Sequence, residues 1–152
     1  MEPQIVTKPA FTIVGLNYHG QNKNQEIPQL WGTFMERAAV VQGVINPTTC
    51  YGACDNFDEA AGTFAYLAAY EVGADTAVPA EMERWDIPAN TYAVFSCTLP
   101  TIHEAYGHIY NTWLPQSAYQ RAPGPEFELY DEAFNANDPS SLLYLYVPVR
   151  QA

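Results

Sequence analysis

The stretch TWLPQSAYQRAPGPEFELYDEAF (residues 112–134) contains the end of a helix, a turn and a strand. Pro115 is expected to end the helix, because proline disfavours helical geometry in the residue before it and has no N–H to donate. In the strand that follows, side chains alternate between two faces, so Glu126, Glu128 and Tyr130 share one face. This stretch therefore predicts a helix, a turn and a strand that brings two carboxylates to the same side of a sheet.

The order strand, helix, strand, strand occurs twice along the chain. The first copy has expected strands at 10–20, 48–57 and 62–73, and the second has them at 82–98, 123–134 and 140–150. Two amphipathic helices are predicted from apolar residues spaced by three and four: Ile27, Leu30, Trp31, Phe34, Met35, Ala38 and Val41, and then Ile102, Tyr106, Ile109, Tyr110 and Trp113.

The two copies indicate an internal duplication over about residues 4–75 and 80–152. Pro9 begins a short match with the segment at Pro88, and FAYLAAYEV from Phe64 matches LLYLYVPV from Leu142. We expect one α+β domain over residues 1–152, built from tandem duplicated βαββ units. They form either one antiparallel sheet with both helices over one face, or two sheets with a cleft between them. Either arrangement leaves a central groove, which is a natural ligand cleft.

The composition limits the function. Hydrophobic residues make up 48% of the chain and charged residues only 15%, so the chain is globular rather than disordered. Six Lys and Arg against 17 Asp and Glu give a net charge of −11, which argues against nucleic acid and anionic membranes as partners. A negative cleft would attract a cationic ligand. Acidity that only maintains solubility is the alternative explanation.

Metal sites, disulfides and membrane spans are not expected. The odd count of cysteines (Cys50, Cys54 and Cys97) and their spacing fit neither a disulfide framework nor a zinc site. The N-terminus has no secretory signal pattern, and no apolar run approaches the ~20 residues that span a bilayer. A reduced, cytoplasmic setting is the simplest expectation.

Aromatic residues are abundant, with eleven Tyr, seven Phe and three Trp. Such residues are usually core, but a buried tyrosine hydroxyl needs a partner, and a core built only for packing would use Phe. Tyr144 and Tyr146 share one strand face, and Tyr66 and Tyr70 hold similar places in the first copy. We therefore expect aromatic walls for a flat or cationic guest.

Glu128 admits two interpretations. The first is an acidic strand face in contact with water. The second places Glu128 on the cleft side beneath aromatic rings, where burial of its carboxylate is unfavourable unless a bound cation or hydrogen bonds compensate.

The motifs of this chain resemble those of the GyrI-like, or AraC-type effector-binding, superfamily. The C-terminal signature consists of Trp113, Leu114 and Pro115, then Ser117 and Tyr119, then Pro125, Phe127, Glu128 and Tyr130. Upstream, Ile87, Pro88, Tyr92 and Phe95 resemble the family's Ile-Pro-x-x-x-Tyr-Ala-Val-Phe strand. Size and acidity are most similar to the integron-associated branch.

The resemblance implies a ligand cleft between the two βαββ units. In multidrug-sensing members, the family's acidic residue pairs with cationic amphiphilic drugs. That residue maps onto Glu128 of this chain. The walls would be aromatic, with Trp85, Tyr92, Tyr110 and Tyr146 as further ligand-binding residues. No cofactor, metal or catalytic residue is implied. The chain lacks a helix-turn-helix segment, so we expect drug sensing or sequestration without direct DNA contact, as a homodimer or with a regulatory protein partner.

Three alternatives remain open. Glu128 could be the general base of a GyrI-like hydrolase of strained cyclopropane-bearing toxins. The chain could be a protein-interaction module with an exposed apolar patch. Haem binding would need an axial ligand, and His19, His103 and His108 are not expected to face a pocket.

Overall fold

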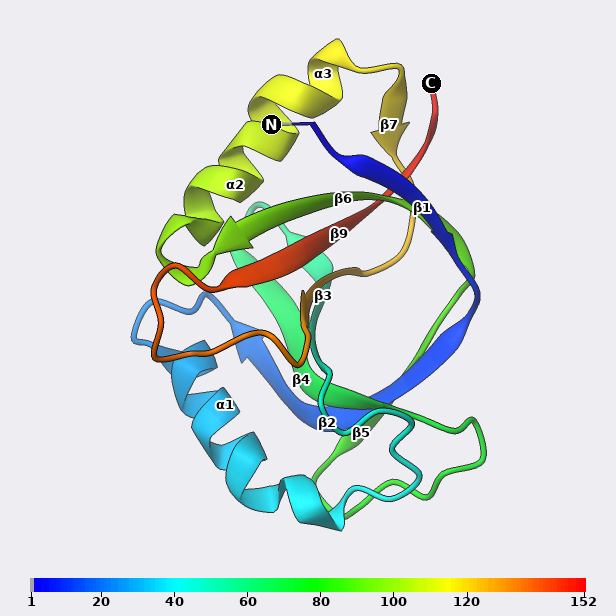
Figure 1. The fold of residues 1–152 in the computed structure, drawn as a ribbon, viewed down its shortest axis with the longest axis vertical. Helices are drawn as coiled ribbons and strands as arrows, with labels where there is room; N and C mark the ends of the chain where they lie inside the picture. The colour runs from blue at the N-terminus through cyan, green and yellow to red at the C-terminus, as the bar shows by residue number, and fades with distance from the viewer. Residues whose placement is uncertain (1) are drawn as a thin grey trace.

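The fold is built on one strongly curved antiparallel sheet, which a computed structural model describes over residues 2–152 (Figure 1). Its strands are β1 (Gln4–Lys8), β2 (Phe11–Gly20), β3 (Cys50–Asp58), β4 (Thr63–Val72), β5 (Glu83–Ile87), β6 (Asn90–Thr98), β7 (Tyr119–Arg121), β8 (Glu126–Tyr130) and β9 (Leu142–Gln151). They pair in the order β1-β6-β9-β8-β3-β4-β2-β5, and β7 pairs separately with β9. The expected α+β class with an antiparallel sheet is confirmed.

The strand order is symmetric about the contact between β3 and β8. On one side lie β8, β9 and β6, and on the other side lie β3, β4 and β2. Each edge is completed by a strand from the other half of the chain: β1 pairs with β6, and β5 pairs with β2. The sequence pattern of two similar units therefore corresponds to two similar halves of one continuous sheet.

Three strand predictions need correction. The segment 82–98, expected as one strand, forms β5 and β6 with a break at Pro88 and Ala89. Pro88 has no N–H for a ladder hydrogen bond, and the two strands pair with different neighbours. Strands β1 and β7 were not expected, because Gln4–Lys8 and Tyr119–Arg121 are too short to show a clear alternation.

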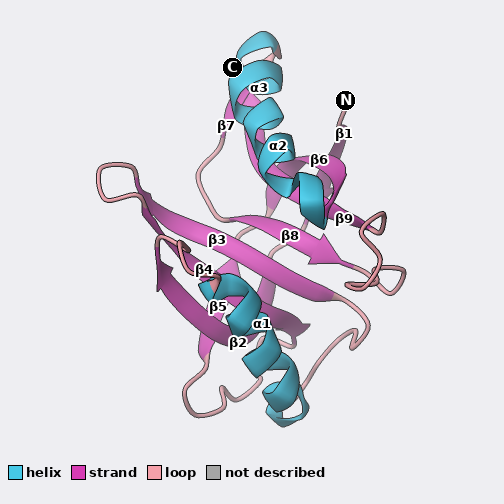
Figure 2. Ribbon diagram, turned by 90° about the vertical axis from the view of Figure 1, so that its left-hand side faces the viewer, coloured by secondary structure: helices cyan, strands magenta, loops and turns pink. Residues whose placement is uncertain are grey.

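Both helices cover the same face of the sheet, which we call the helix face (Figure 2). Helix α1 (Glu26–Arg37) packs on β2 and β4 through Phe34, which is fully buried. Helix α2 (Ile102–His108) continues through a π-helical turn (Ile109–Trp113) into α3 (Leu114–Gln116) and packs on β6 and β9. Two short 3₁₀ turns, Ala38–Val40 and Leu99–Thr101, flank these helices.

The helical periodicity predicted the buried stripes with one exception. All five apolar positions expected in the second helix pack into the core beneath it. In α1, Met35 is 51% exposed, although the pattern placed it on the buried side. Met35 adjoins Phe34 along the stripe, and only Phe34 points at the sheet.

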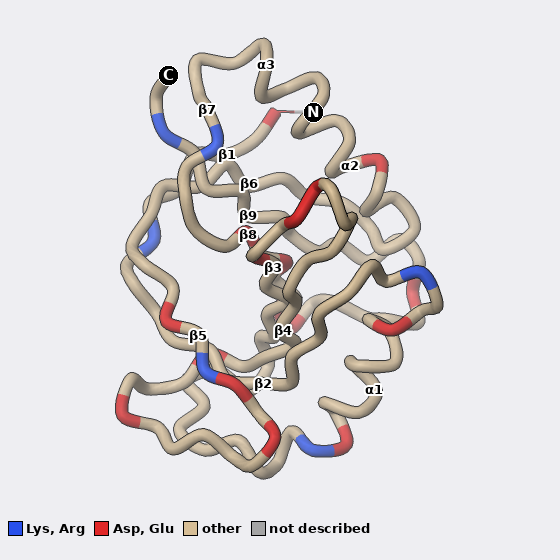
Figure 3. Tube along the Cα trace, turned by 180° about the vertical axis from the view of Figure 1, so that it is seen from behind, with Lys and Arg blue, Asp and Glu red and all other residues tan. Residues whose placement is uncertain are grey.

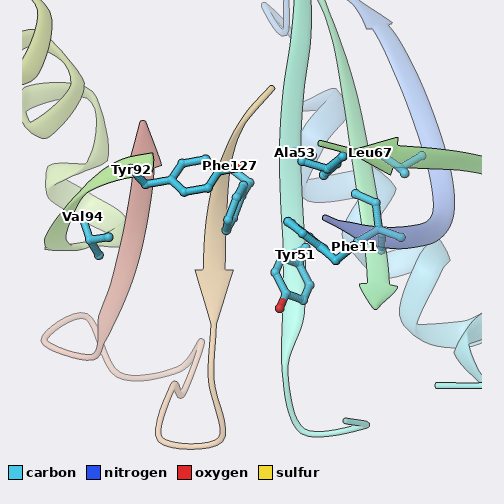
Figure 4. Close-up of a cluster of buried hydrophobic side chains, with 10 residues drawn as sticks. Phe11, Tyr51, Ala53, Leu67, Tyr92, Val94 and Phe127 are labelled. Atoms are coloured by element: carbon cyan, nitrogen blue, oxygen red, sulfur yellow. The ribbon is translucent and has the colours of Figure 1, made fainter. Parts of the chain in front are cut away.

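The opposite face of the sheet carries a second core, drawn in Figure 4. Phe127 of β8 lies at its centre, with its ring stacked on Tyr146 at a centroid distance of 4.6 Å. It also makes edge contacts with Phe11 and Tyr92 at 5.5 and 5.2 Å. Aromatic packing therefore fills the opposite face close to β8.

Charged residues are spread along the chain, and acidic positions outnumber basic ones, as Figure 3 shows. Among residues 2–152, no helix combines the length and apolar character needed to cross a bilayer.

Candidate functional site

Glu128 lies on the helix face at the centre of the sheet and is only 8% exposed. Its Oε1 accepts hydrogen bonds from the hydroxyls of Tyr66 on β4 and Tyr130 on β8, at 2.9 and 2.8 Å. The expected alternation along β8 is thereby confirmed for Glu128 and Tyr130. Of the two interpretations, the structure supports the buried carboxylate and excludes a strand face in open water.

A glycine makes room for this carboxylate. Gly52 on β3 is the cross-strand partner of Glu128. A Cβ atom at Gly52 would lie 2.0 Å from the Tyr66 hydroxyl oxygen and 2.7 Å from Glu128 Oε1. Since both distances are far below van der Waals contact, only glycine leaves the Tyr66–Glu128 hydrogen bond intact.

Helix α1 covers the site through Trp31. Its indole Nε1 donates to the Tyr66 hydroxyl at 2.9 Å, and its ring meets Tyr130 edge-on at a centroid distance of 5.5 Å. Trp31, Tyr66 and Glu128 thus form a relay of hydrogen bonds from the helix to the sheet. Trp31 and Tyr130 form an aromatic cover over the carboxylate, and hydrogen bonds join both residues to it, directly from Tyr130 and through Tyr66 from Trp31.

Burial sets the acidity of Glu128. Desolvation raises its pKa from 4.5 to about 7, hydrogen bonds from Tyr130 and Tyr66 oppose the rise, and the charge of Glu126 adds to it. Burial also raises the pKa of Tyr66 and of Tyr130 well above the ordinary value. The tyrosines therefore remain hydrogen-bond donors, and Glu128 changes charge near neutral pH.

A second buried carboxylate lies two residues away on the same strand face. Glu126 is 5% exposed and accepts a hydrogen bond from the Tyr110 hydroxyl. Arg121 forms an ion pair with Glu126 at 3.5 Å and donates from Nε to the Tyr110 oxygen at 3.1 Å. Burial raises the pKa of Glu126, and the contacts with Tyr110 and Arg121 oppose this.

Helix α2 contributes an unsatisfied polar group to the same face. The hydroxyl oxygen of Tyr106 is buried and has no hydrogen-bond partner among the described residues. Burial first and the charge of Glu128 second raise its pKa well above the ordinary value. An unpartnered buried hydroxyl is unfavourable, and the Tyr106 hydroxyl lies close enough to Glu126 to help lower the pKa of that carboxyl.

The structure separates the aromatic residues that the sequence grouped with Glu128. Tyr110 lies on the helix face but bonds Glu126. Tyr92 and Tyr146 contact Phe127 on the opposite face, and Trp85 on the edge strand β5 packs against that same core. The carboxylate and three of the four expected wall residues therefore lie on different sides of one sheet.

The tyrosines of the two halves also differ in position. In the sheet, Ala68 is opposite Gly52, and Leu145 is opposite Glu128. Tyr66 therefore shares the helix face with Glu128, whereas Tyr144, directly before Leu145, points to the other side. The sequence match aligned Tyr66 with Tyr144, and a difference of one residue in register inverts the face of every side chain.

Sequence reasoning missed three participants of the site: Trp31, Gly52 and Arg121. Tyr66 was expected as part of an aromatic wall, but not as a hydrogen-bond donor to Glu128. The alternation of β8 alone gives Tyr130. The others come from elements whose contact with β8 depends on the strand order, which periodicity does not report. A glycine within an otherwise regular strand signals a close approach, and Gly52 could have been found in this way.

Two hollows open on the surface near α2 and α3. One, of about 450 Å³, is lined by residues that include His108, Trp113 and Tyr119. The other, of about 370 Å³, is lined by residues that include Tyr110, Tyr119 and Arg121. Glu128 lines neither hollow, in keeping with the aromatic cover over its carboxylate.

Solved structures share this fold. The protein SAV2435 bound to tetraphenylphosphonium superposes with a TM-score of 0.72 at 20% identity, over 99% of this chain and 94% of that one. The integron cassette protein VCH_CASS2 of Vibrio cholerae gives a TM-score of 0.63 at 18% identity, over 98% and 96% of the two chains. At identities of 20% and 18%, these similarities show a shared fold and nothing more specific.

One relative is similar in sequence. The chain is 37% identical over 152 residues to the transcriptional regulator BrlR of Pseudomonas aeruginosa. The match covers 98% of this chain and 56% of BrlR, so the chain spans little more than half the length of that relative.

The family model for the integron-associated effector binding protein Cass2 matches residues 4–149, which include both halves of the sheet, both helices and the buried carboxylates. The resemblance inferred from the Trp-Leu-Pro and Phe-Glu-x-Tyr motifs is thereby confirmed, and the chain belongs to the integron-associated effector-binding protein family.

Proposed function

We propose that this effector-binding protein binds lipophilic organic cations on its helix face, with Glu128 as the buried counter-ion. The observation that carries the proposal is an incomplete charge balance. Glu128 is buried, yet within residues 2–152 none of the ion pairs involves it. A buried carboxylate without a cation is unfavourable when ionised, and a bound cation would restore the balance.

The surroundings of Glu128 suit such a guest. Tyr66 and Tyr130 donate hydrogen bonds to the carboxylate, and Trp31 on α1 contacts both of these tyrosines. Tyr106 on α2 lies close enough for the charge of Glu128 to raise its pKa. The face of an aromatic ring attracts a cation, by about 0.5–2 kcal/mol for each contact. Apolar burial adds about 25 cal/mol per Å² before the losses on association are subtracted.

Entry requires movement of the aromatic cover. Trp31 and Tyr130 lie over the carboxylate in the described conformation. Trp31 is held by one hydrogen bond to Tyr66 and by edge packing on Phe34 and Tyr130, and its rotation would break these contacts. A guest that replaces the indole would keep the Tyr66–Glu128 and Tyr130–Glu128 hydrogen bonds.

The relatives support the class of ligand. SAV2435, which shares the fold, was solved with tetraphenylphosphonium, a lipophilic cation. The family name denotes effector binding. The net charge of −11 would favour the approach of a cation over an anion. Sensing or sequestering such molecules is the corresponding biological role.

The test is a calorimetric and thermal-shift titration with tetraphenylphosphonium and a neutral aromatic of similar shape. We expect micromolar binding of the cation, about −8 kcal/mol. Glu128→Gln should lower the affinity for the cation by about tenfold or more and leave the affinity for the neutral compound nearly unchanged.

The matched control is Glu104→Gln. Glu104 is exposed on α2, so this variant removes the same charge from the surface without touching the site. The counter-ion proposal would be wrong if both variants lost the same affinity for the cation. It would also be wrong if Glu128→Gln lowered the affinities for the cation and for the neutral compound equally.

One observation favours a second function. A carboxylate with a pKa of about 7 and two tyrosine donors is suited to general-base catalysis at neutral pH. A hydrolase of strained electrophiles would show product formation that Glu128→Gln abolishes. Saturable binding of such compounds without product would exclude it.

A further inference from the structure

Among residues 2–152, two buried carboxylates lie on the helix face, and Arg121 is the one cation that pairs with either of them. Glu126 and Glu128 are separated by one residue on β8, about 7 Å along the strand. Arg121 pairs with Glu126 at 3.5 Å, and its Nε also reaches the Tyr110 hydroxyl that donates to Glu126. Glu126 is therefore neutralised from within the protein, whereas Glu128 is not.

The charges of this pair of sites can be added. With both carboxylates ionised, Glu126, Glu128 and Arg121 carry one net negative charge. A monocation beside Glu128 brings the sum to zero. A dication would leave one positive charge uncompensated in a buried site, which is unfavourable unless Arg121 moves away.

We infer that Arg121 is a specificity-determining residue that restricts the site to ligands with a single positive charge. The inference rests on the proposed function and assigns Glu126 the role of a second, masked counter-ion. Without Arg121, the two carboxylates would match a ligand whose positive charges lie about 7 Å or less apart.

The position of Arg121 fits this role. Its side chain is 26% exposed and lines the hollow of about 370 Å³ next to Tyr110. It also donates to the carbonyl oxygen of Ala122, so the guanidinium is held by three groups at the boundary between site and solvent. Glu126, which is 5% exposed, lies on the inner side of that boundary.

The experiment compares ethidium with propidium, which share one aromatic core and carry one and two positive charges. Affinities are measured by fluorescence for wild type and Arg121→Met. Because an unpaired buried carboxyl holds its proton more tightly, the titrations are run at about pH 8.5. We expect wild type to prefer ethidium, and Arg121→Met to shift the propidium-to-ethidium affinity ratio by about tenfold or more toward propidium.

Two controls separate the site from general charge. Arg84→Met removes a cation that pairs with Asp86 on the edge strand β5 and should leave the ratio unchanged. Adding Glu126→Gln to Arg121→Met should return the ratio toward the wild-type value. An unchanged ratio in Arg121→Met, or an equal shift in Arg84→Met, would overturn the inference.

The single variant Glu126→Gln decides the matter if Arg121→Met does not fold. It leaves Arg121 without its carboxylate partner on the face of the sheet that also carries Glu128, so ethidium should bind about tenfold or more weakly. Undiminished ethidium binding would overturn the inference. If ethidium binding depends on Glu128 but not on Arg121 or Glu126, only this inference is wrong. If no cation binds, the proposed function is wrong as well.

Discussion

Gly52 and Glu128 are cross-strand partners, and the Tyr66 hydroxyl and the Glu128 carboxylate occupy the space that a side chain at Gly52 would need. The contact lies at β3 and β8, where the two halves of the sheet meet. The site is therefore formed by the pairing of the halves, and each half alone lacks part of it.

Gly52→Ala should displace Tyr66 or Glu128. We expect a loss of about 1–3 kcal/mol in the free energy of unfolding, as for other overpacked sites, together with weaker cation binding. Urea denaturation and calorimetry measure the two effects. The matched control is Gly32→Ala in α1, where a Cβ would meet nothing within 4 Å. That variant should gain about 0.5–1 kcal/mol, because alanine favours the helix. Wild-type stability and affinity in Gly52→Ala would contradict the geometry.

The pH dependence of stability follows from the raised pKa of Glu128. Between its ordinary value of 4.5 and about 7, the unfolded chain has lost the proton and the folded protein still holds it. Stability should therefore fall as the pH rises through this window, by about 3 kcal/mol, and then level off. Urea denaturation of wild type and Glu128→Gln at several pH values isolates this contribution as a difference in slope. Parallel profiles would mean that Glu128 does not titrate there.

Cation binding should show the opposite trend. Only the ionised carboxylate is a counter-ion, so affinity for a permanently charged cation should rise by about tenfold per pH unit below 7 and reach a plateau above it. Binding near pH 6 should release a proton, detectable as a dependence of the calorimetric heat on the buffer. Glu128→Gln serves as the control with a flat profile. A flat profile in wild type would show that the carboxylate is already ionised or takes no part.

Tyr92→Phe tests which face of the sheet receives the ligand. The Tyr92 hydroxyl is buried and has no hydrogen-bond partner in the part of the chain that the structure describes, so its removal should leave stability unchanged or raise it by up to about 1 kcal/mol. Cation affinity should not change, because Tyr92 lies on the face opposite Glu128. A marked loss of affinity, with stability retained, would move the site to the other face and restore the grouping of Tyr92 with the ligand that the sequence suggested.

The sequence predicted the elements of the fold better than their lateral contacts. Periodicity located both helices and the inward stripe ending at Trp113, and alternation put Glu128 and Tyr130 on one face. These predictions succeed because they depend on neighbours within one element. The break at Pro88 was missed because β-branched and aromatic residues continue on both sides of it.

The composition of the site could be predicted only in part. Glu128 was identified from its motif, but Trp31 and Tyr66 reach it from α1 and β4, at sequence separations that no local pattern encodes. The assignment of Tyr92 and Tyr146 to the same walls depended on a choice of face. That choice follows from register, which is fixed by cross-strand pairing in the folded sheet.

The exchange of edge strands has a mechanical consequence. Because β1 completes the edge at β6 and β5 completes the edge at β2, each half of the sheet is tied to the other by a crossing segment as well as by the central seam. Hinge opening of the two halves would have to break three sets of ladder hydrogen bonds. A ligand should therefore enter by displacing the side chains and helices on the helix face. The sheet itself should stay rigid, with the same strand register with and without ligand.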